Sequence, residues 1–289
     1  KNAKINLMET TKQQLKRITL WAVAIIIVFA IGLRIFGSWH DEWSGYNAST
    51  MISDGSCNIA IIPITGDITP YAGPDLDENG NKLPLSTNPD DVLFTLRGAE
   101  NDPNILGLLA RIDSNGGTLA ASEIISNGFK NSSLPVVALI REIGVSAAYL
   151  IATGAKTIIA SPFSDVGGIG VTMSYLENTA KNNKEGLIYI PLASAKFKDY
   201  GNPDKSLTFD ERILLERDLK IFHEHFVKLV AENRNLPVEQ IAKLADGSSM
   251  PGSLALENKL IDSLGDQETA RVWFAEQLKI KPEEVIFCE

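Results

Sequence analysis

The sequence predicts an α/β fold, and two observations support this prediction. Between residues 59 and 192, apolar runs bounded by Gly, Pro, Asn and Asp alternate with segments of helical spacing. Such runs are typical of buried strands, and their alternation with helices favours parallel βαβ units. After residue 192 the spacing of apolar residues is helical, so helices are expected to complete the domain.

The individual elements can be assigned in chain order. Strands are expected at 59–64, 105–112, 136–140, 157–160 and 187–192, and the glycine-rich passage at 167–172 leads into another strand. Helices are expected at 90–99, at 119–130, from Ser146, at 209–234 after a capping box of Thr208 and Glu211, from Pro237, and at 267–278. A long polar loop at 67–90 separates the first strand from the first helix.

An uncharged segment near the N-terminus predicts a membrane anchor. Residues 18–33 lie between Arg17 and Arg34 without a charged side chain, and the apolar stretch continues to residue 36. Basic residues precede the segment, whereas Asp41 and Glu42 follow it, so the positive-inside rule predicts a cytoplasmic N-terminus. A cleaved signal peptide is the alternative, although no small-residue cleavage site follows the apolar run.

The domain organisation follows from this segment. We expect a cytoplasmic tail at 1–17, a transmembrane anchor at 18–36, a polar tether at 37–57 and an extracytoplasmic domain at 58–289. The outer compartment is either the periplasm or the cell surface. The net charge of -9 argues against nucleic-acid binding.

Neither a metal nor a cofactor is expected. Cys57 and Cys288 lack the spacing of zinc ligands, and they form either a disulfide of an exported domain or two buried thiols. Residues 75–81 match the first half of a calcium-binding loop. Position twelve of that loop is Ser86, however, where a bidentate Glu is required.

Ser146 is the main candidate for chemistry. It follows a predicted strand and a turn at Gly144, and it opens a helix of small residues. A hydroxyl at a helix N-terminus lies beside unpaired backbone N–H groups and the positive end of the dipole. That position suits either a plain N-cap or a nucleophile that must stabilise an oxyanion. The Gly116 and Gly117 pair, also between a strand and a helix, directs backbone N–H groups toward a ligand.

Five segments occur in a specific order after the anchor. They are 113–117 (DSNGG), 145–149 (VSAAY), 167–171 (GGIGV), 194–199 (SAKFKD) and 246–265, which runs from DGSSMPG to LIDSLG. Together they resemble the short, single-domain form of the SppA family of signal peptide peptidases. The resemblance covers residues 59 to about 266. It implies a ClpP/crotonase-like fold of repeated ββα units with C-terminal helices, assembled as a bowl-shaped homo-oligomeric ring.

The resemblance also implies a Ser–Lys peptidase. Matched residue by residue, Ser146 is the expected nucleophile and Lys198 the expected general base, with the oxyanion hole at Gly116 and Gly117. A free lysine is charged at neutral pH, and desolvation in an apolar pocket is what makes it a base. In the short forms the two residues come from neighbouring protomers. The expected substrates are cleaved signal peptides and other hydrophobic peptides near the membrane.

The chain departs from the family pattern at two residues expected to line the site, Ala147 and Gly168. The family usually has Gly at the first position and, at the second, a Ser that hydrogen-bonds the lysine amine. Ser164, which is near in sequence, or a water molecule could substitute for that serine. These departures favour a second hypothesis, a catalytically weak or inactive homologue that serves as an oligomeric scaffold or binding protein at the membrane.

Two other enzyme classes fit less well. A Ser-His-Asp triad would need His40, His223 or His225. His40 adjoins the anchor, and the other two lie two residues apart on a predicted helix, so they point to different sides. A crotonase-like acyl-CoA enzyme is disfavoured by the expected location outside the cytoplasm.

Overall fold

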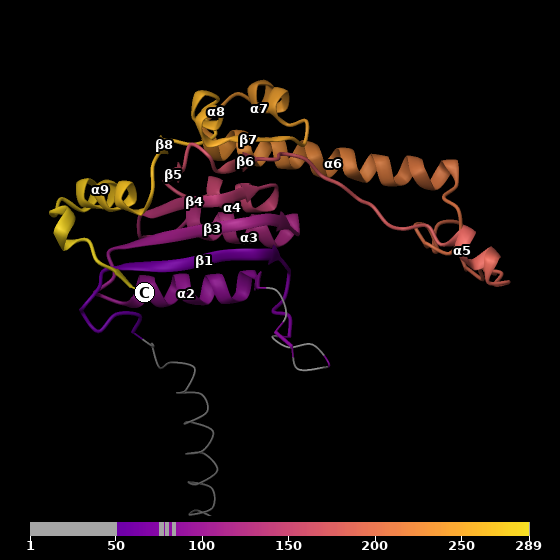
Figure 1. Cartoon of the computed structure of the whole chain (residues 1–289), viewed down its shortest axis with the longest axis horizontal. Coiled ribbons are helices and arrows are strands. Elements are labelled where there is room, and N and C mark those ends of the chain that lie inside the picture. The colour runs from indigo at the N-terminus through magenta and orange to yellow at the C-terminus, as the bar shows by residue number, and fades with distance from the viewer. Residues whose placement is uncertain (1–50, 75–77, 79–80, 83–84, 289) are drawn as a thin grey trace, which may run out of the picture. The chain divides into compact units, whose positions relative to one another are not determined.

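Parallel strand pairing holds the domain together. The structure, a computed structural model, describes residues 51–74, 78, 81–82 and 85–288. At the centre of the sheet, β1 (Ile59–Ile68), β3 (Gly107–Gly117), β4 (Val136–Val145) and β5 (Thr157–Ala160) pair side by side in parallel (Figure 1). The predicted mixed α/β fold is therefore confirmed, and β1, β3 and β4 extend beyond their predicted ends.

Short strands extend this central sheet. β2 (Ser86–Thr87) and β9 (Phe287–Cys288) pair with β1, and β8 (Ser263–Leu264) pairs with β5. β6 (Asp165–Gly167) lies along the end of β4 and pairs with β7 (Ser249–Pro251). The β6–β7 pair is antiparallel, unlike the other pairs in the described residues.

Helices cover both faces of the sheet. On one face lie α2 (Pro89–Asn101), α3 (Leu119–Lys130), α4 (Ala147–Thr153) and the C-terminal part of α6 (Phe209–Arg234). On the other face lies α9 (Gln267–Leu278). Successive strand residues point to opposite faces of the sheet. Leu108 and Ala110 belong to the hydrophobic cluster on the face of α2, α3, α4 and α6, and Leu109 belongs to the cluster on the face of α9. Three short elements complete the C-terminal region: α7 (Val238–Leu244), α8 (Gly252–Glu257) and η1 (Pro282–Glu284).

Side-chain caps determine where two of the longer helices begin. At α2, Asn88 Oδ1 accepts a hydrogen bond from Asp91 N at 3.0 Å. At α6, Glu211 N donates to Thr208 Oγ1 at 3.3 Å and Thr208 N donates to Glu211 Oε2 at 2.9 Å. The predicted capping box is thus confirmed, and it satisfies two backbone donors that have no partner inside the helix.

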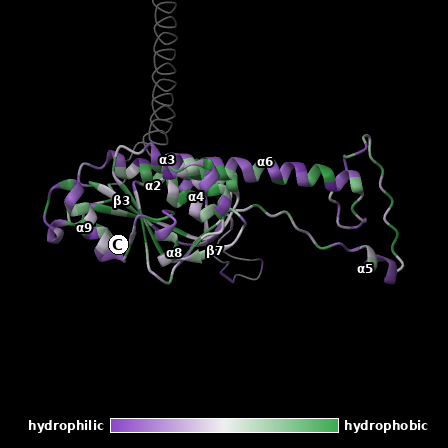
Figure 2. Cartoon of the chain, turned by 90° about the horizontal axis from the view of Figure 1, so that it is seen from above, coloured by the Kyte–Doolittle hydropathy of each residue, from purple (hydrophilic) through white to green (hydrophobic). Residues whose placement is uncertain are grey.

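Residues 172–207, here called the arm, correct two of the predictions from sequence. No strand forms at 187–192, and none continues beyond Gly167 within 167–172. Apart from α5 (Thr179–Lys184), the arm is irregular, and it leaves the sheet in the same direction as the N-terminal half of α6 (Figures 1 and 2). A strand needs a partner backbone, and among the described residues no segment pairs with the arm.

Several predictions fall outside the described residues. They concern the tail at 1–17, the anchor at 18–36, most of the tether and most of the calcium-like segment at 75–81. Within the part of the chain that the structure describes, no helix has the length and apolar character required to cross a membrane.

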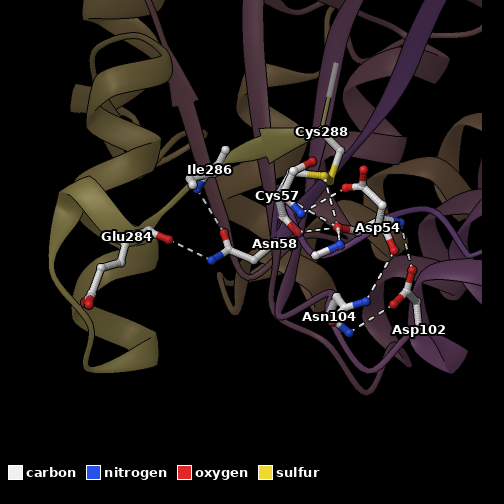
Figure 3. The surroundings of a disulfide bond; sticks show 11 residues. Asp54, Cys57, Asn58, Asp102, Asn104, Glu284, Ile286 and Cys288 are labelled. Atoms are coloured by element: carbon white, nitrogen blue, oxygen red, sulfur yellow. Dashed lines mark hydrogen bonds between the residues drawn. A yellow bond between two sulfur atoms is a disulfide. The ribbon is translucent and has the colours of Figure 1, made fainter.

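A disulfide between Cys57 and Cys288 joins the two ends of the domain (Figure 3). Beside it, Asn58 Nδ2 donates to Glu284 O at 2.7 Å, and Ile286 N donates to Asn58 Oδ1 at 2.9 Å. The segment before β1 therefore holds the C-terminal strand β9 in place. Of the two alternatives that the sequence leaves for the cysteines, the structure contains the disulfide.

The segment that leads to the disulfide also belongs to the domain. Ser53 N donates to Asp102 Oδ2 and Asn104 N donates to Asp102 Oδ1, each at 2.9 Å. These hydrogen bonds, the one from Ser53 foremost, hold the pKa of Asp102 below its usual value. Residues 53–57 are thus fixed at the start of the sheet, although the sequence predicts a tether up to residue 57.

We predict that the double variant Cys57→Ser, Cys288→Ser loses about 2–4 kcal/mol of unfolding free energy, because the cross-link restricts the unfolded chain. Urea denaturation of residues 51–289 measures the loss. Wild-type protein in excess reductant is the control and should unfold at the same urea concentration as the variant. Equal stability of the oxidised wild type and the variant would contradict the prediction.

Candidate active site

Ser146 lies at a strained junction between β4 and α4. Its φ is 55°, which is rare for a residue other than glycine, and its N–H donates to Gly167 O at 2.8 Å. Although Ser146 is the N-cap residue of α4, its side chain makes no capping hydrogen bond. Plain capping therefore does not explain this serine, and its hydroxyl is left available for chemistry.

The helix behind Ser146 is held rigidly. Tyr149 is fully buried and its hydroxyl donates to Leu260 O at 2.8 Å. Burial raises the pKa of Tyr149, so the phenol stays protonated and keeps donating. At the other end of α4, Asn233 Nδ2 donates to Thr153 Oγ1 at 3.0 Å. These contacts tie α4 to α6 and to the segment after α8.

Gly116 packs directly against the Ser146 junction. A Cβ atom added at Gly116 would lie 2.9 Å from Ser146 Cβ and 3.0 Å from Ala147 N. The Gly116 N–H donates to Ser114 Oγ at 3.0 Å, so an oxyanion at Gly116 would compete with this hydrogen bond. Gly117 is the next residue and lies against Ile68 of β1. Both expected oxyanion donors are thus at the same sheet edge as Ser146.

Ser146 opens into a cavity of about 410 Å³. The lining combines glycines, small apolar side chains and a few polar groups: Val145, Ser146, Gly168, Gly170, Val171, Thr172, His223, Ala245, Asp246, Gly247 and Ser249. Of the two residues expected to line the site, Gly168 lines this cavity, whereas Ala147 is fully buried and does not. The cavity is large enough for a substrate side chain.

Two ionisable side chains share this cavity with Ser146. Asp246 accepts hydrogen bonds from Ser248 Oγ at 2.6 Å and from Ser248 N at 2.9 Å, and these lower the pKa of Asp246. His223 comes from α6, and His225 pairs with Glu123 of α3 at 3.3 Å instead. The two histidines therefore point to different sides, as expected. No sequence signal indicates that His223 lines the cavity of Ser146, because the pattern does not show which turn of α6 reaches the sheet edge.

Lys198 is not brought to Ser146 within one chain. It is exposed, lies on the arm and does not line the cavity. Its neighbour Asp199 accepts a hydrogen bond from Tyr189 Oη at 3.0 Å and another from Asn202 Nδ2 at 3.0 Å. Polar contacts within the arm thus give the turn around Lys198 a defined conformation. The expectation that serine and lysine come from different protomers is compatible with this arrangement.

Ser164 does not substitute for the serine that is absent at position 168. Its hydroxyl is buried, lies 2.8 Å from Arg141 O, and accepts a hydrogen bond from Ser161 N at 3.0 Å. It is not part of the cavity lining. The suggestion from sequence that Ser164 could orient the lysine is therefore wrong, because its hydroxyl is buried and already hydrogen-bonded to Arg141 O and Ser161 N.

Comparison with known proteins identifies the family. Residues 128–281, more than half of the chain, match the model of peptidase family S49. The chain belongs to peptidase family S49. A candidate protease of Synechocystis sp. is 35% identical over 67% of this chain and 70% of the relative. Protease 4 of Salmonella typhi is 30% identical over 70% of this chain, and a candidate signal peptide peptidase SppA of Enterococcus faecium is 27% identical over 63%.

The relatives are often longer than the matched region. The chain spans 56% of a related Methanocaldococcus jannaschii protein, 33% of protease 4 and 54% of the Enterococcus faecium protein. Among solved structures, a membrane-bound stomatin-specific protease is similar with a TM-score of 0.48 and 14% identity, over 81% of this chain and 94% of that one. The SppA-type resemblance stated from sequence is confirmed at the level of the S49 family.

We predict that Gly116→Ala lowers the unfolding free energy by about 1–3 kcal/mol more than Gly55→Ala does, because the new Cβ overpacks the Ser146 junction. Gly55 is a matched control: its φ is 94°, close to the 107° of Gly116, and its nearest contact would be 4.0 Å away. Urea denaturation of both variants gives the difference. Equal losses would mean that the junction can move without cost.

Proposed function

We propose that this S49-family chain is a membrane-anchored serine endopeptidase that uses Ser146 and Lys198 to degrade signal peptides or other hydrophobic peptides near the membrane. The anchor would be residues 18–36, and the peptidase domain, residues 58–289 of ClpP/crotonase-like type, would lie in the periplasm or at the cell surface. The observation that carries the proposal is Ser146 itself. Its hydroxyl has no capping partner and opens into a cavity at a strained strand–helix junction.

The chemistry requires a neutral lysine amine beside Ser146. In the proposed reaction the amine takes the Ser146 Oγ proton while Oγ bonds to the scissile carbonyl carbon, and the π electron pair moves onto the carbonyl oxygen. Backbone N–H groups at Gly117 or Gly116 would stabilise that oxyanion. When the oxyanion collapses back to a carbonyl, the scissile C–N bond breaks and the leaving peptide amine takes the proton from the lysine, which leaves an acyl group on Ser146. Water repeats the sequence, releasing the acyl group and restoring Ser146.

A homo-oligomer would complete the site. Lys198 is exposed in the single chain, and a lysine acts as a base only when it is desolvated. The arm that carries it also exposes large apolar side chains, with Leu176 at 86%, Ile188 at 83% and Leu192 at 95%. Such a concentration of apolar surface is typical of an interface. A second copy covering the arm would bury these side chains and bring Lys198 to its own Ser146.

The disulfide supports a location outside the cytoplasm. Disulfides persist in oxidising compartments and are rare where thiols are kept reduced. Cys57 is the last residue of the expected tether, so the Cys57–Cys288 bond lies at the start of the domain. A domain exported behind an N-terminal anchor would meet the conditions that this bond requires.

A catalytically weak or inactive homologue is the second candidate function. One observation favours it: position 168 is glycine, so no side chain there can orient a lysine amine, and Ser164 is used elsewhere. In that case the chain would be an oligomeric scaffold or binding protein at the membrane, and the apolar arm would serve assembly alone.

The two candidates differ in the reactivity of Ser146. We expect a fluorophosphonate probe to label wild-type protein at Ser146, and neither Ser146→Ala nor Lys198→Ala to be labelled. Lys196→Ala is the matched control, because Lys196 is also exposed and pairs with Asp210 of α6. Tryptic mapping by mass spectrometry locates the label. Absence of labelling and of peptide cleavage in the assembled wild type would leave the scaffold function.

A mixing experiment tests whether the dyad spans protomers. Ser146→Ala and Lys198→Ala proteins are unfolded together in equal amounts and refolded. If each site takes its serine from one protomer and its lysine from the neighbour, half of the protomers in a random ring supply an intact serine and half supply an intact lysine. About one quarter of the sites are then intact, and cleavage returns. Each variant refolded alone is the control. A mixture as inactive as its components would show that both residues must come from one chain.

A further inference from the structure

We propose that His223 is a positioning residue of this site: its imidazole accepts a hydrogen bond from the amine of the base lysine and holds that amine toward Ser146. The proposal rests on the Ser–Lys function above and adds a residue to it. It explains how a chain with Gly168 could still orient its base.

The geometry of the cavity points to His223. His223 lines the same cavity as Ser146 and Gly168, and it is partly buried on α6. One turn further along the helix, Phe226 and Val227 are buried in the core, so α6 is rigid at this point. Within the described residues, neither the His223 ring nor Ser146 Oγ has a hydrogen-bond partner. Both groups are therefore free to bind an amine that enters the cavity.

A neutral amine needs an acceptor as well as the serine. Its lone pair takes the Ser146 proton, and its N–H bonds must be held by another group for that lone pair to point correctly. Gly168 has no side chain, and the Ser164 hydroxyl is used by Arg141 O. A neutral imidazole has one ring nitrogen that accepts a hydrogen bond, which neither Gly168 nor Ser164 offers to the amine.

The other polar groups of the cavity suit this role less well. The Asp246 carboxylate would stabilise the charged ammonium form and so oppose the lysine's function as a base. Thr172 and Ser249 are exposed, so their hydroxyls are hydrated and not fixed toward the cavity. His223 combines a neutral acceptor with a rigid backbone.

A dependence on pH follows from the chemistry of the ring. A protonated imidazole has two donors and no acceptor, so acid would remove the hydrogen bond to the amine. The charged groups around His223 are few. Asp246 is the other ionisable side chain lining the cavity in the described residues, and on α7 the charged Glu239 and Lys243 are exposed and outside it. On α6 itself, Lys220 and Glu224 pair with each other at 3.8 Å.

The test uses His223→Ala and His223→Gln in the full chain, with His225→Ala as matched control, since His225 lies on the same helix and contacts Glu123 outside the cavity. We expect His223→Ala to lower kcat toward a fluorogenic peptide about 10–100-fold, with KM within about twofold. His223→Gln keeps an acceptor that does not titrate, so its kcat should stay within about fivefold of wild type. The control should match wild type.

The dependence of kcat on pH distinguishes the proposed hydrogen bond from a purely structural role of His223, because a structural role would not change the slope of this dependence. Because a protonated imidazole has no acceptor, we expect log kcat to fall more steeply toward acid pH in wild type than in His223→Gln, whose amide oxygen keeps its acceptor. Thermal melting and the mass of the assembly are measured for every variant. If His223→Ala fails to fold, the slope in wild type and His223→Gln still decides.

The outcomes separate this proposal from the proposed function. Wild-type kcat in His223→Ala, or a His223→Gln as inactive as a folded His223→Ala, would overturn the role of His223 while peptide cleavage stands. An unchanged acid slope in His223→Gln would overturn it as well. Failure of wild type to be labelled at Ser146 would overturn the peptidase function and this role with it.

Discussion

The complete burial of α4 is the constraint on which the rest of the structure depends. All its residues, from Ala147 to Thr153, are between 0% and 2% exposed. The sheet and other helices enclose the whole of α4, whereas its N-cap residue Ser146 is only partly buried. Ser146 is therefore presented at the sheet edge by packing. The positive φ of Ser146 is maintained because the helix behind it cannot move.

The two halves of α6 differ in burial. Its buried apolar residues are confined to the C-terminal half, where Phe226 and Val230 pack on the layer that contains α4. Its N-terminal half exposes Phe209 and Ile213 and accompanies the arm away from the sheet (Figures 1 and 2). A single continuous helix thus connects the arm to the layer that contains α4.

The sequence predicted correctly those elements whose stabilising hydrogen bonds join residues near one another in the chain. Its prediction was wrong where a run with strand-like composition has no neighbouring strand to pair with. Helix caps such as Thr208 with Glu211 are local hydrogen bonds, so the pattern alone identifies them. The run at 187–192 has the composition of a strand, but composition does not provide a neighbouring backbone, and the segment stays exposed. The residues near Ser146 were found through motifs. His223 was not, because its place depends on how α6 crosses the sheet rather than on its own neighbours in sequence.

The Cys57–Cys288 bond has a consequence for the lifetime of a protein that carries an exposed arm. Irregular, exposed segments are where proteases cut first, and the arm lies between the two cysteines in sequence. A cut there would leave two polypeptides still joined covalently through the disulfide. The central strands before the cut and α6 after it would remain in one molecule. Under oxidising conditions, a protease that cuts the arm would therefore nick the domain without dividing it.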